Sequence, residues 1–489
     1  MTSPRYLIIH GHFYQPPREN PWSGSISQQI SAAPFPNWNE RINRECYAPN
    51  ARARLLNSKT GSIAKIINNY EYLSFNIGPT LLLWLKDHDP ETYKLVLAAD
   101  QTAARRHHGH GPALAQVFNH VILPLANSRD QLTQAIWGLS HFRSAFGREP
   151  EGMWLAETAA DLESLAILAK VGLKFTVLAQ NQIKAVRPLT KGRDEPWTDL
   201  TASPDPREPY RIFWGQGAND YLDVFVYDGP VSRAVAFERL LRDGSVFLER
   251  LKQAFGAETP NYPRLVNLAT DGESYGHHFH FGDMTLAWLF NALDNQPPDD
   301  PNPIKLTNYG EYLALYPPRF EAKLVDNSSW SCCHGVERWR ADCGCATGSN
   351  PNWNQKWRTP LRDGLNWLRD QLALIFEAEG RPLLKDPWAA RDAYIAVTLA
   401  DYDERVRTDF LARETTNAPT AAESQKIIRL LEAQRMGLYM FTSCAWFFDD
   451  LAGLEPVQNL RYAARAIALT QDLAKTDLTE GLLTFLRKA

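Results

Sequence analysis

The spacing of hydrophobic and polar positions changes along the chain near residue 350. Before that point, short apolar runs alternate with longer amphipathic stretches, a pattern typical of strands followed by helices in parallel sheets and barrels. Helices are expected over residues 113–123, where Leu114, Val117 and Val121 recur at three- and four-residue steps, and over residues 162–171. Strands are expected over residues 6–10, 72–76, 152–155, 174–178, 224–227 and 265–269.

After residue 350 the strand pattern fades, and long amphipathic patterns predict helices over residues 361–377, 421–440 and 457–473. The sequence therefore predicts an α/β fold in two parts. A barrel domain is expected over residues 1–325, and a junction rich in Cys and His followed by a helical domain over residues 326–489.

Composition narrows the class of partner. Lys and Arg number 52 and Asp and Glu number 56, so the chain has no excess of positive charge for nucleic acid, and a neutral partner fits better. There is no apolar run of roughly 18 residues or more, and the apolar run that ends at Ile9 is too short for a signal peptide. We therefore expect no membrane insertion and a cytoplasmic location.

Acidic and imidazole side chains follow directly after three of the expected strands. His10 and His12 end the first, Glu157 follows the strand at 152–155, and Asp271 with Glu273 follows the strand at 265–269. Because the chemistry of such barrels lies at the carboxyl ends of the strands, these side chains are expected on one rim. Cleavage of a glycosidic bond needs a carboxylate at the anomeric carbon and a carboxylic acid at the leaving oxygen, and Glu157 and Asp271 fit that pair.

Each of these motifs also has a plainer interpretation. His10 and His12 can be hydrogen-bond donors or metal ligands, or can satisfy buried loop groups. Glu157 can be a surface charge, and the Asp-Gly-Glu at 271–273 can be a hydrated turn, which Asp-Gly favours. The separation of the two carboxyl groups does not follow from the sequence.

Two further clusters could bind a metal, one rich in histidine and one that combines cysteine with histidine. In the first, His107, His108 and His110 can bind a metal or line a substrate loop. The second, the cysteine cluster, suggests zinc, although adjacent side chains diverge and the spacing is not that of a standard zinc finger. Packed thiols and disulfides therefore stay open as alternatives. The candidate metal ligands of this second cluster are Cys333, His334, Cys343 and Cys345, with Cys332 beside them.

Two tryptophans, Trp353 and Trp357, follow the cysteine cluster. Both can line a sugar cleft, because aromatic rings stack on the apolar faces of sugars, and Trp357 is the candidate for substrate contact. A place in the core is the more common role for a tryptophan.

In their order along the chain, these motifs resemble the signature regions of glycoside hydrolase family 57, whose members act on α-glucans as amylases, 4-α-glucanotransferases and branching enzymes. The family's His-x-His-Gln-Pro is matched by His10-Gly11-His12, with Gln15-Pro16 following after two extra residues. Its Trp-Leu-x-Glu is matched by residues 154–157 and its Asp-Gly-Glu by residues 271–273. Residues 110–120 and the cysteine cluster are similar to a poorly characterised branch of the family.

The resemblance implies an incomplete (β/α)7 barrel followed by a helical domain. It also implies a retaining mechanism through a covalent glycosyl-enzyme intermediate, with Glu157 as nucleophile and Asp271 as general acid/base, and with no required cofactor. An α-1,4-glucan is the expected substrate. The residues expected to form substrate subsites are His10, His12, Trp154, Glu273 and His110.

Two rival classes stay open. A metal-dependent carbohydrate deacetylase or mannosidase-like enzyme would use His10, His12 and Asp271 as metal ligands, but the Trp-Leu-x-Glu motif has no role in a three-ligand metal site. A non-catalytic glucan-binding protein would keep the fold without the activity. Whether an enzyme of this kind hydrolyses or transfers depends on how well a sugar acceptor competes with water.

Overall fold

The computed structural model describes residues 3–190, 192–200, 203–256 and 262–489, so residues 1 and 2, with which the expected barrel domain begins, lie outside it. The chain forms two compact units, each discontinuous in sequence. The first unit consists of Met1–Gln15, Gln28–Gln116 and Arg148–Asp326. The second consists of Pro16–Ser27, Val117–Gly147 and Asn327–Ala489. The second unit therefore takes in two segments that the sequence analysis assigned to the barrel domain.

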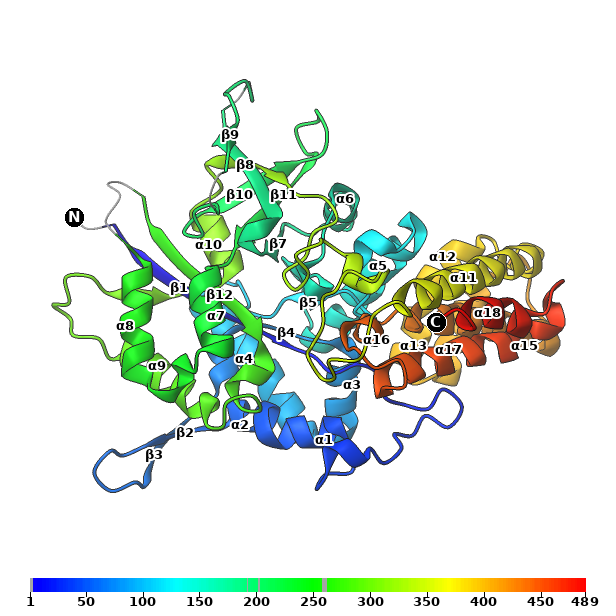
Figure 1. Ribbon diagram of the computed structural model, residues 1–489, viewed down its shortest axis with the longest axis horizontal. Coiled ribbons are helices and arrows are strands. Elements are labelled where there is room, and N and C mark those ends of the chain that lie inside the picture. Colours follow the sequence, from blue (N-terminus) through cyan, green and yellow to red (C-terminus); the bar gives the residue numbers. More distant parts are fainter. Residues whose placement is uncertain (1–2, 191, 201–202, 257–261) are drawn as a thin grey trace. The chain divides into compact units, whose positions relative to one another are not determined.

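Within the described residues, the fourteen strands all belong to the first unit, and Figure 1 labels most of them. Their bounds are β1 (Arg5–Phe13), β2 (Ala53–Leu56), β3 (Ile63–Ile67), β4 (Ser74–Ile77), β5 (Ala115–Gln116), β6 (Met153–Trp154), β7 (Phe175–Leu178), β8 (Ile183–Pro188), β9 (Thr198–Asp199), β10 (Pro209–Phe213), β11 (Tyr221–Val226), β12 (Arg264–Asp271), β13 (Ile304–Leu306) and β14 (Phe320–Leu324).

Helices of the first unit lie between these strands. Their bounds are α1 (Trp38–Ile42), α2 (Ala48–Ala51), α3 (Pro79–His88), α4 (Pro90–Arg106), α6 (Leu162–Lys170), α7 (Gly229–Phe237), α8 (Gly244–Ala254), α9 (Gly282–Asp294) and α10 (Tyr309–Leu315). Several begin at a side-chain cap, such as Asp161, whose carboxylate accepts from the amide of Ser164 over 2.8 Å at the start of α6.

β1 lies at the centre of a run of parallel strands. It pairs with β12 along one edge and with β13 and then β4 along the other, and its residues from Tyr6 to Phe13 are buried. A strand that is covered on both faces does not alternate between apolar and polar residues, which explains the continuous apolar run at Leu7 to Ile9.

Parallel pairing continues beyond β4. Bridges connect β4 to the segment before β5, and the residue before β6 to β7. β5 pairs with β6 and β7 pairs with β11, and all of these contacts are parallel. The amide of Asp228, just after β11, donates to the carbonyl of Asn267 in β12 over 2.8 Å. The parallel order is therefore β12, β1, β4, β5, β6, β7 and β11, and the carboxyl ends of these strands face the same way.

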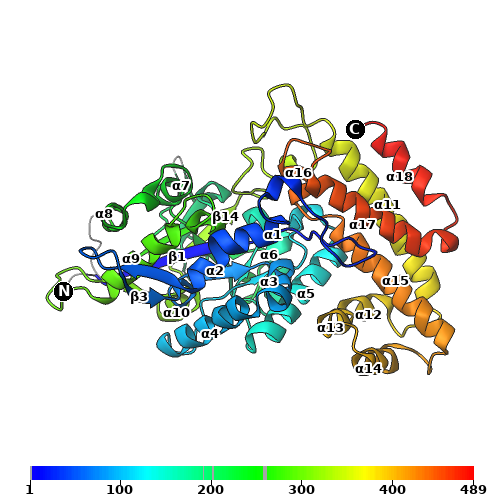
Figure 2. The same cartoon turned by 90° about the horizontal axis from the view of Figure 1, so that it is seen from below.

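The second unit is helical. Its helices are α5 (Ser128–Phe146), α11 (Arg358–Gly380), α12 (Pro387–Ala393), α13 (Ile395–Leu399), α14 (Glu404–Glu414), α15 (Ala421–Tyr439), α16 (Cys444–Phe447), α17 (Leu454–Thr470) and α18 (Leu478–Leu486). Figure 2 shows α11, α15, α17 and α18 packed along one another. A buried cluster of Phe118, Trp137, Ile395 and Leu438 joins the region of α5 to α13 and α15.

The six strands and the helix at 162–171 expected from the sequence are present, with ends shifted by up to three residues, and the three C-terminal helices are confirmed. The helix expected over residues 113–123 is wrong. That segment forms β5, which pairs with β6, and its residues are buried throughout rather than along one face. Apolar spacing alone did not distinguish a fully buried extended segment from a helix.

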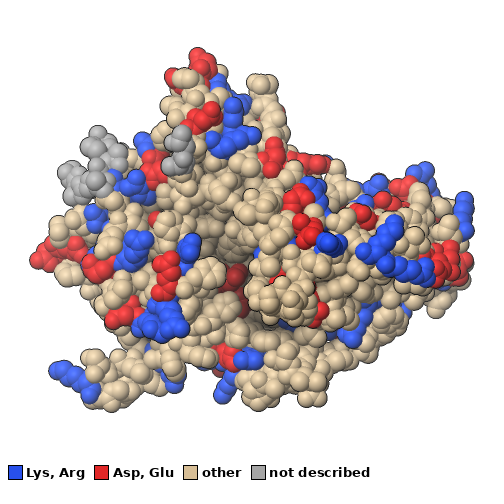
Figure 3. All heavy atoms as spheres, viewed as in Figure 1, with Lys and Arg blue, Asp and Glu red and all other residues tan. Residues whose placement is uncertain are grey.

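Two surface properties bear on partners. Basic and acidic side chains are interspersed on the face seen in Figure 3, in keeping with the near balance of 52 and 56 charges. Within the described ranges, none of the helices combines the length and the apolar character needed to cross a membrane.

Candidate active site

Glu157 and Asp271 both lie at the carboxyl ends of parallel strands. Asp271 is the last residue of β12, and its register partner on β1 is His12. Glu157 follows the end of β6 by three residues, in a 3-10 turn over Ala156–Thr158. The structure thus places both predicted catalytic carboxyl groups on the same rim of the parallel strands.

The turn that carries Glu157 has unusual backbone geometry. Glu157 has φ 58° and Thr158 has φ 50°, a region that non-glycine residues rarely occupy. Gln182 holds this turn, because its amide nitrogen donates to the Thr158 carbonyl over 2.8 Å and its amide oxygen accepts from the Thr158 hydroxyl over 2.8 Å. Backbone strain that is held by its surroundings is typical of functional sites.

The environment of Asp271 favours its protonated form. Asp271 is an exposed residue by its solvent-accessible surface, yet the protein groups crowded around its carboxyl raise its pKa above the ordinary value by displacing water. The negative charges of Glu273 and then Glu157 raise the pKa further. Glu157 and Asp271 are therefore close enough to interact, and Asp271 has the electrostatic character of a general acid.

Glu273 lies behind this pair and is nearly buried. Burial raises its pKa to about 7, although a hydrogen bond from the Tyr47 hydroxyl opposes the shift. Tyr47 donates to Glu273 Oε1 over 2.5 Å, and the backbone amide of Tyr14 donates to the same oxygen over 3.2 Å. Glu273 therefore connects the loops after β1 and β12. These contacts fix the position of its carboxyl group, and the expected role of Glu273 in a substrate subsite stays a prediction.

A π-helix over Asn43–Tyr47 supports the Asp-Gly-Glu turn. Besides Tyr47, it supplies Cys46, whose thiol donates to the Gly272 carbonyl over 3.3 Å, and Glu45, which pairs with His277. A Cβ at Gly272 would lie 2.3 Å from a ring carbon of Phe13, so only glycine fits between Asp271 and Glu273. Short π-helices are frequent at functional sites.

His10, Trp154 and His12 form a stack beneath the rim. The Trp154 ring lies 4.7 Å from the His10 ring and 5.1 Å from the His12 ring, with interplanar angles of 16° and 19°. Trp154 has 0% exposed surface, so it presents no open ring face to a sugar here, and its role in a substrate subsite stays a prediction. Its face is already covered by the two histidines. His10 is likewise fully buried and His12 is 4% exposed.

Both histidines are neutral hydrogen-bonding groups. Burial lowers the pKa of each to about 3. His10 contacts Ser74 Oγ and Asn76 Oδ1, each over 3.1 Å, and Asn76 Nδ2 lies 2.9 Å from His12 Nδ1 and 2.6 Å from Gln116 Oε1.

Sequence reasoning missed Asn76, Gln116 and Tyr47. Asn76 ends an expected strand, so the rule that identified His10, Glu157 and Asp271 could have found it. Gln116 lay in a segment interpreted as a helix, and no local signal pointed to Tyr47.

His110 lies at the opposite end of the strands. It precedes β5, and its Nδ1 contacts Glu151 Oε2 over 2.8 Å at the start of β6. The amino-terminal ends of parallel strands lie away from the carboxyl rim, so the structure does not bring His110 to the carboxyl pair, and its expected subsite role stays a prediction. His107 and His108 also face a structural partner, because both contact the Glu311 carboxylate, over 2.7 Å and 2.9 Å.

Trp357 and the cysteine cluster belong to the second unit. Trp357 is 6% exposed at the start of α11, so it offers no open face for a sugar, whereas Trp353 is 42% exposed. The set of four candidate metal ligands in the structure differs from the set expected from the sequence. The structure brings together Cys332, His334, Cys343 and Cys345, and leaves Cys333 outside the group.

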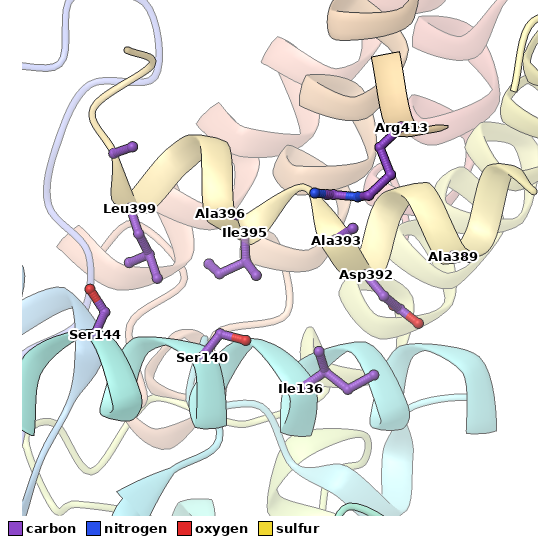
Figure 4. A pocket seen from close by; sticks show the side chains of 11 residues that line it. Ile136, Ser140, Ser144, Ala389, Asp392, Ala393, Ile395, Ala396, Leu399 and Arg413 are labelled. Carbon is purple, nitrogen blue, oxygen red and sulfur yellow. The ribbon is translucent and has the colours of Figure 1, made fainter. Parts of the chain in front are cut away.

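A cavity of about 690 Å³ lies in the second unit, between α5 and the α12–α13 region (Figure 4). Ile136, Ile395 and Leu399 make much of its lining apolar, and its carboxylate, Asp392, accepts from Thr133 over 2.5 Å. Neither Glu157 nor Asp271 lines it, so this cavity is not part of the site that the carboxyl pair forms.

The geometry does not favour a metal at His10, His12 and Asp271. In the described part of the chain, these three side chains do not form a group whose ligand atoms could share an ion. Both ring nitrogens of His10 and Nδ1 of His12 are taken up by hydrogen bonds with Ser74 and Asn76.

Comparison with known proteins identifies the family of this chain. The model of glycosyl hydrolase family 57 matches residues 22–324, which is more than half of the chain, and the chain therefore belongs to this family. A domain of unknown function, DUF3536, matches residues 353–489. Alpha-amylase 1 of Dictyoglomus thermophilum is 29% identical over 99 residues, a stretch that covers 20% of this chain and 13% of that relative.

Solved structures share the fold at low identity. An exo-type maltose-forming amylase from Pyrococcus sp. ST04 has a TM-score of 0.69 at 14% identity, covering 98% of this chain and 82% of that one. A branching enzyme from Pyrococcus horikoshii has a TM-score of 0.57 at 14% identity, covering 99% of this chain and 94% of that one. At such identities the likeness shows a common fold.

Proposed function

We propose that this chain is a retaining glycosidase or transglycosidase that acts on α-1,4-glucans, with Glu157 as nucleophile and Asp271 as general acid/base. The observation that carries the proposal is the carboxyl pair on one strand rim. Negative charge from Glu157 and Glu273 adds to burial in keeping Asp271 protonated. Family membership and the names of its relatives, which include amylases and a branching enzyme, support the choice of α-glucan.

The proposed scaffold for this chemistry is an incomplete (β/α)7 barrel. The parallel order from β12 through β1 to β11, and the hydrogen bond from Asp228 back to β12, support this arrangement. Its carboxyl rim would hold Glu157, Asp271 and, behind them, Glu273.

In the first step, the Glu157 carboxylate attacks the anomeric carbon while the Asp271 carboxylic acid gives its proton to the leaving glycosidic oxygen. One carbon–oxygen bond breaks and one forms, which leaves a glycosyl ester on Glu157 and an ionised Asp271. In the second step, Asp271 takes a proton from water or from an acceptor sugar hydroxyl, which attacks the same carbon and releases Glu157.

The state of each carboxyl group fits its step. A raised pKa keeps Asp271 protonated where an ordinary carboxyl is ionised, so it can donate in the first step. Loss of the Glu157 charge on glycosylation removes one of the influences that raise the Asp271 pKa, which favours ionisation and the base role in the second step. A retaining mechanism requires the two carboxyl groups to approach to about 5–5.5 Å in the substrate complex.

The test is incubation of the purified chain with maltooligosaccharides, amylose and glycogen, with β-linked glucans as controls. We expect the chain-length distribution of the α-glucans to change, and NMR to show the α-anomer as the first-formed product. Activity confined to β-linked or non-glucan sugars would overturn the substrate. A β-anomer as first product would overturn the retaining mechanism, and binding of α-glucans without product would favour a binding protein.

A further inference from the structure

Four soft ligand atoms converge in the segment between β14 and α11. The thiol sulfurs of Cys332, Cys343 and Cys345 and a ring nitrogen of His334 all lie within 4.8 Å of one another. None of the six cysteines, all of which are described, is in a disulfide. We propose that these four side chains bind one zinc ion in a closed, structural site in the second unit.

The separations match the edges of a tetrahedron. With Zn–S bonds of about 2.3 Å and Zn–N bonds of about 2.0–2.1 Å, two sulfur ligands lie about 3.8 Å apart, and a sulfur and a nitrogen about 3.6 Å apart. Cys332 Sγ lies 3.7 Å from Cys345 Sγ and 4.0 Å from Cys343 Sγ, and Cys345 Sγ lies 3.5 Å from His334 Nδ1. Packed thiols can touch in pairs at such distances, but packing does not require three sulfurs and an imidazole nitrogen to be mutual neighbours.

The local sequence explains how the ligands converge. They come as two pairs, Cys332 with His334 and Cys343 with Cys345, each separated by one residue. Side chains two apart can point to the same side, whereas those of adjacent residues diverge, so Cys333 is left exposed. Gly344, between the last two ligands, has φ 78°, a conformation that glycine adopts without strain.

The surroundings suit an anionic metal centre. Three thiolates and a divalent ion carry a net charge of −1. Arg358 has 0% exposed surface, and its Nη1 lies 3.8 Å from Cys343 Sγ and 3.1 Å from the Cys345 carbonyl. Asp449 holds the neighbouring loop by accepting from the amide of Thr347 over 2.8 Å, and it lies 3.7 Å from Arg358. Such outer contacts orient ligands and tune the metal.

A structural role follows from the ligand count. All four tetrahedral positions are filled by protein, so no position is left for water or substrate, unlike in catalytic zinc sites. Between β14 and α11, the regular structure in the described residues is one 3-10 helix, Glu337–Trp339. A metal crosslink would supply the order that backbone pairing does not provide there.

The first test is elemental analysis of the full chain purified without a metal-affinity column. We expect one zinc per chain in the wild type and in Cys333→Ser, and loss of stoichiometric zinc in Cys332→Ser. Cys333 is the matched control, because it is adjacent in sequence and its thiol, although 3.5 Å from His334 Nδ1, does not belong to the group of four mutually close ligand atoms. Wild-type protein with no zinc after reconstitution, stoichiometric iron in its place, or equal loss in both variants would overturn the proposal.

A second measurement covers the case in which Cys332→Ser does not fold. The wild type, stripped by a chelator and reloaded with Co²⁺, should show thiolate-to-cobalt charge transfer and the intense visible bands of a tetrahedral site. With zinc bound, a chromogenic disulfide reagent should react rapidly with Cys333. It should react with the three ligand thiols only after the zinc has been removed by the chelator. Weak octahedral cobalt bands, or ligand thiols that react at the same rate with and without chelator, would contradict the site.

Discussion

His12 and Asp271 are register partners at the ends of two adjacent parallel strands, β1 and β12. This pairing explains why motifs far apart in the sequence meet. The strand that ends in Asp271 runs beside the strand that carries the neutral, buried His12, and Trp154, which stacks on His12, lies three residues before Glu157. The packing of the first unit therefore connects all three motif regions.

Replacing either catalytic carboxyl by its amide should abolish turnover and preserve the fold. Glu157→Gln cannot form the glycosyl ester and Asp271→Asn cannot transfer the proton, so each should lower kcat by several orders of magnitude. The measurement is initial rate on a maltooligosaccharide, with circular dichroism as the check on folding.

Glu163→Gln and Asp299→Asn are matched controls, because both residues are exposed and lie outside the carboxyl pair. They should retain wild-type rates. Near wild-type activity in Glu157→Gln or Asp271→Asn would show that the role assigned to that residue is wrong.

Glu273 should make the stability of the protein depend on pH. Its folded pKa is raised from 4.5 to about 7, so the folded state keeps a proton that the unfolded state loses. The resulting stabilisation is present below pH 4.5 and is lost as pH rises through about 7. At about 1.4 kcal/mol per pKa unit, the loss amounts to roughly 3 kcal/mol.

Urea unfolding of the wild type and Glu273→Gln at about pH 5 and about pH 8 measures this contribution. The free energy of unfolding of the wild type should fall relative to that of the variant as pH rises, because the amide cannot ionise. A constant difference between the two proteins across this range would mean that Glu273 is ionised throughout.

Gln182 should control the position of Glu157. Gln182→Leu removes both hydrogen bonds to Thr158, which frees the strained turn, so we expect kcat to fall by about 10- to 100-fold while KM changes little. Asn181→Leu, at the exposed neighbouring position, should leave kcat unchanged. Equal rates in wild type and Gln182→Leu would show that the turn does not depend on this contact.

Trp137 should be a stability determinant of the second unit. It has 0% exposed surface in the cluster with Phe118, Ile395 and Leu438, so Trp137→Ala should lower the free energy of unfolding by about 3–5 kcal/mol. Trp353→Ala, at a 42% exposed position, should change it by less than about 0.5 kcal/mol. Similar effects of the two substitutions in denaturant unfolding would contradict the packing of Trp137 in this cluster.

The local pattern of apolar and polar residues was sufficient to predict the strands that carry the site. The apolar runs before His10, Glu157 and Asp271 are strands because each is buried on both faces, and chemistry at strand ends follows from parallel pairing. The sequence analysis named the segment in which the structure brings soft ligand atoms together, but it listed Cys333 where the structure has Cys332, and zinc itself stays a proposal. Only the folded backbone shows which of two adjacent side chains turns inward.

Other features depend on tertiary packing that the sequence does not encode locally. Residues 113–123 have helical spacing but are buried on every side, so pairing with β6 determines their structure. Trp154 was expected at a sugar because aromatic rings suit sugars, yet the histidines on β1 cover it. Tyr47 supports Glu273 across 226 positions of sequence, which no motif could indicate.

The central claim, that Glu157 is the nucleophile and Asp271 the acid/base, is tested most directly by trapping the intermediate. With α-maltosyl fluoride as substrate, the fluoride ion departs without the help of a general acid. Release of the glycosyl ester, in contrast, needs a general base. The Asp271→Asn variant should therefore accumulate the covalent species. Mass spectrometry of the digested variant is predicted to show a maltosyl adduct on the peptide that contains Glu157, and none in the Glu157→Gln, Asp271→Asn double variant. An adduct on another residue, or hydrolysis of the fluoride with inversion and no adduct, would contradict the account.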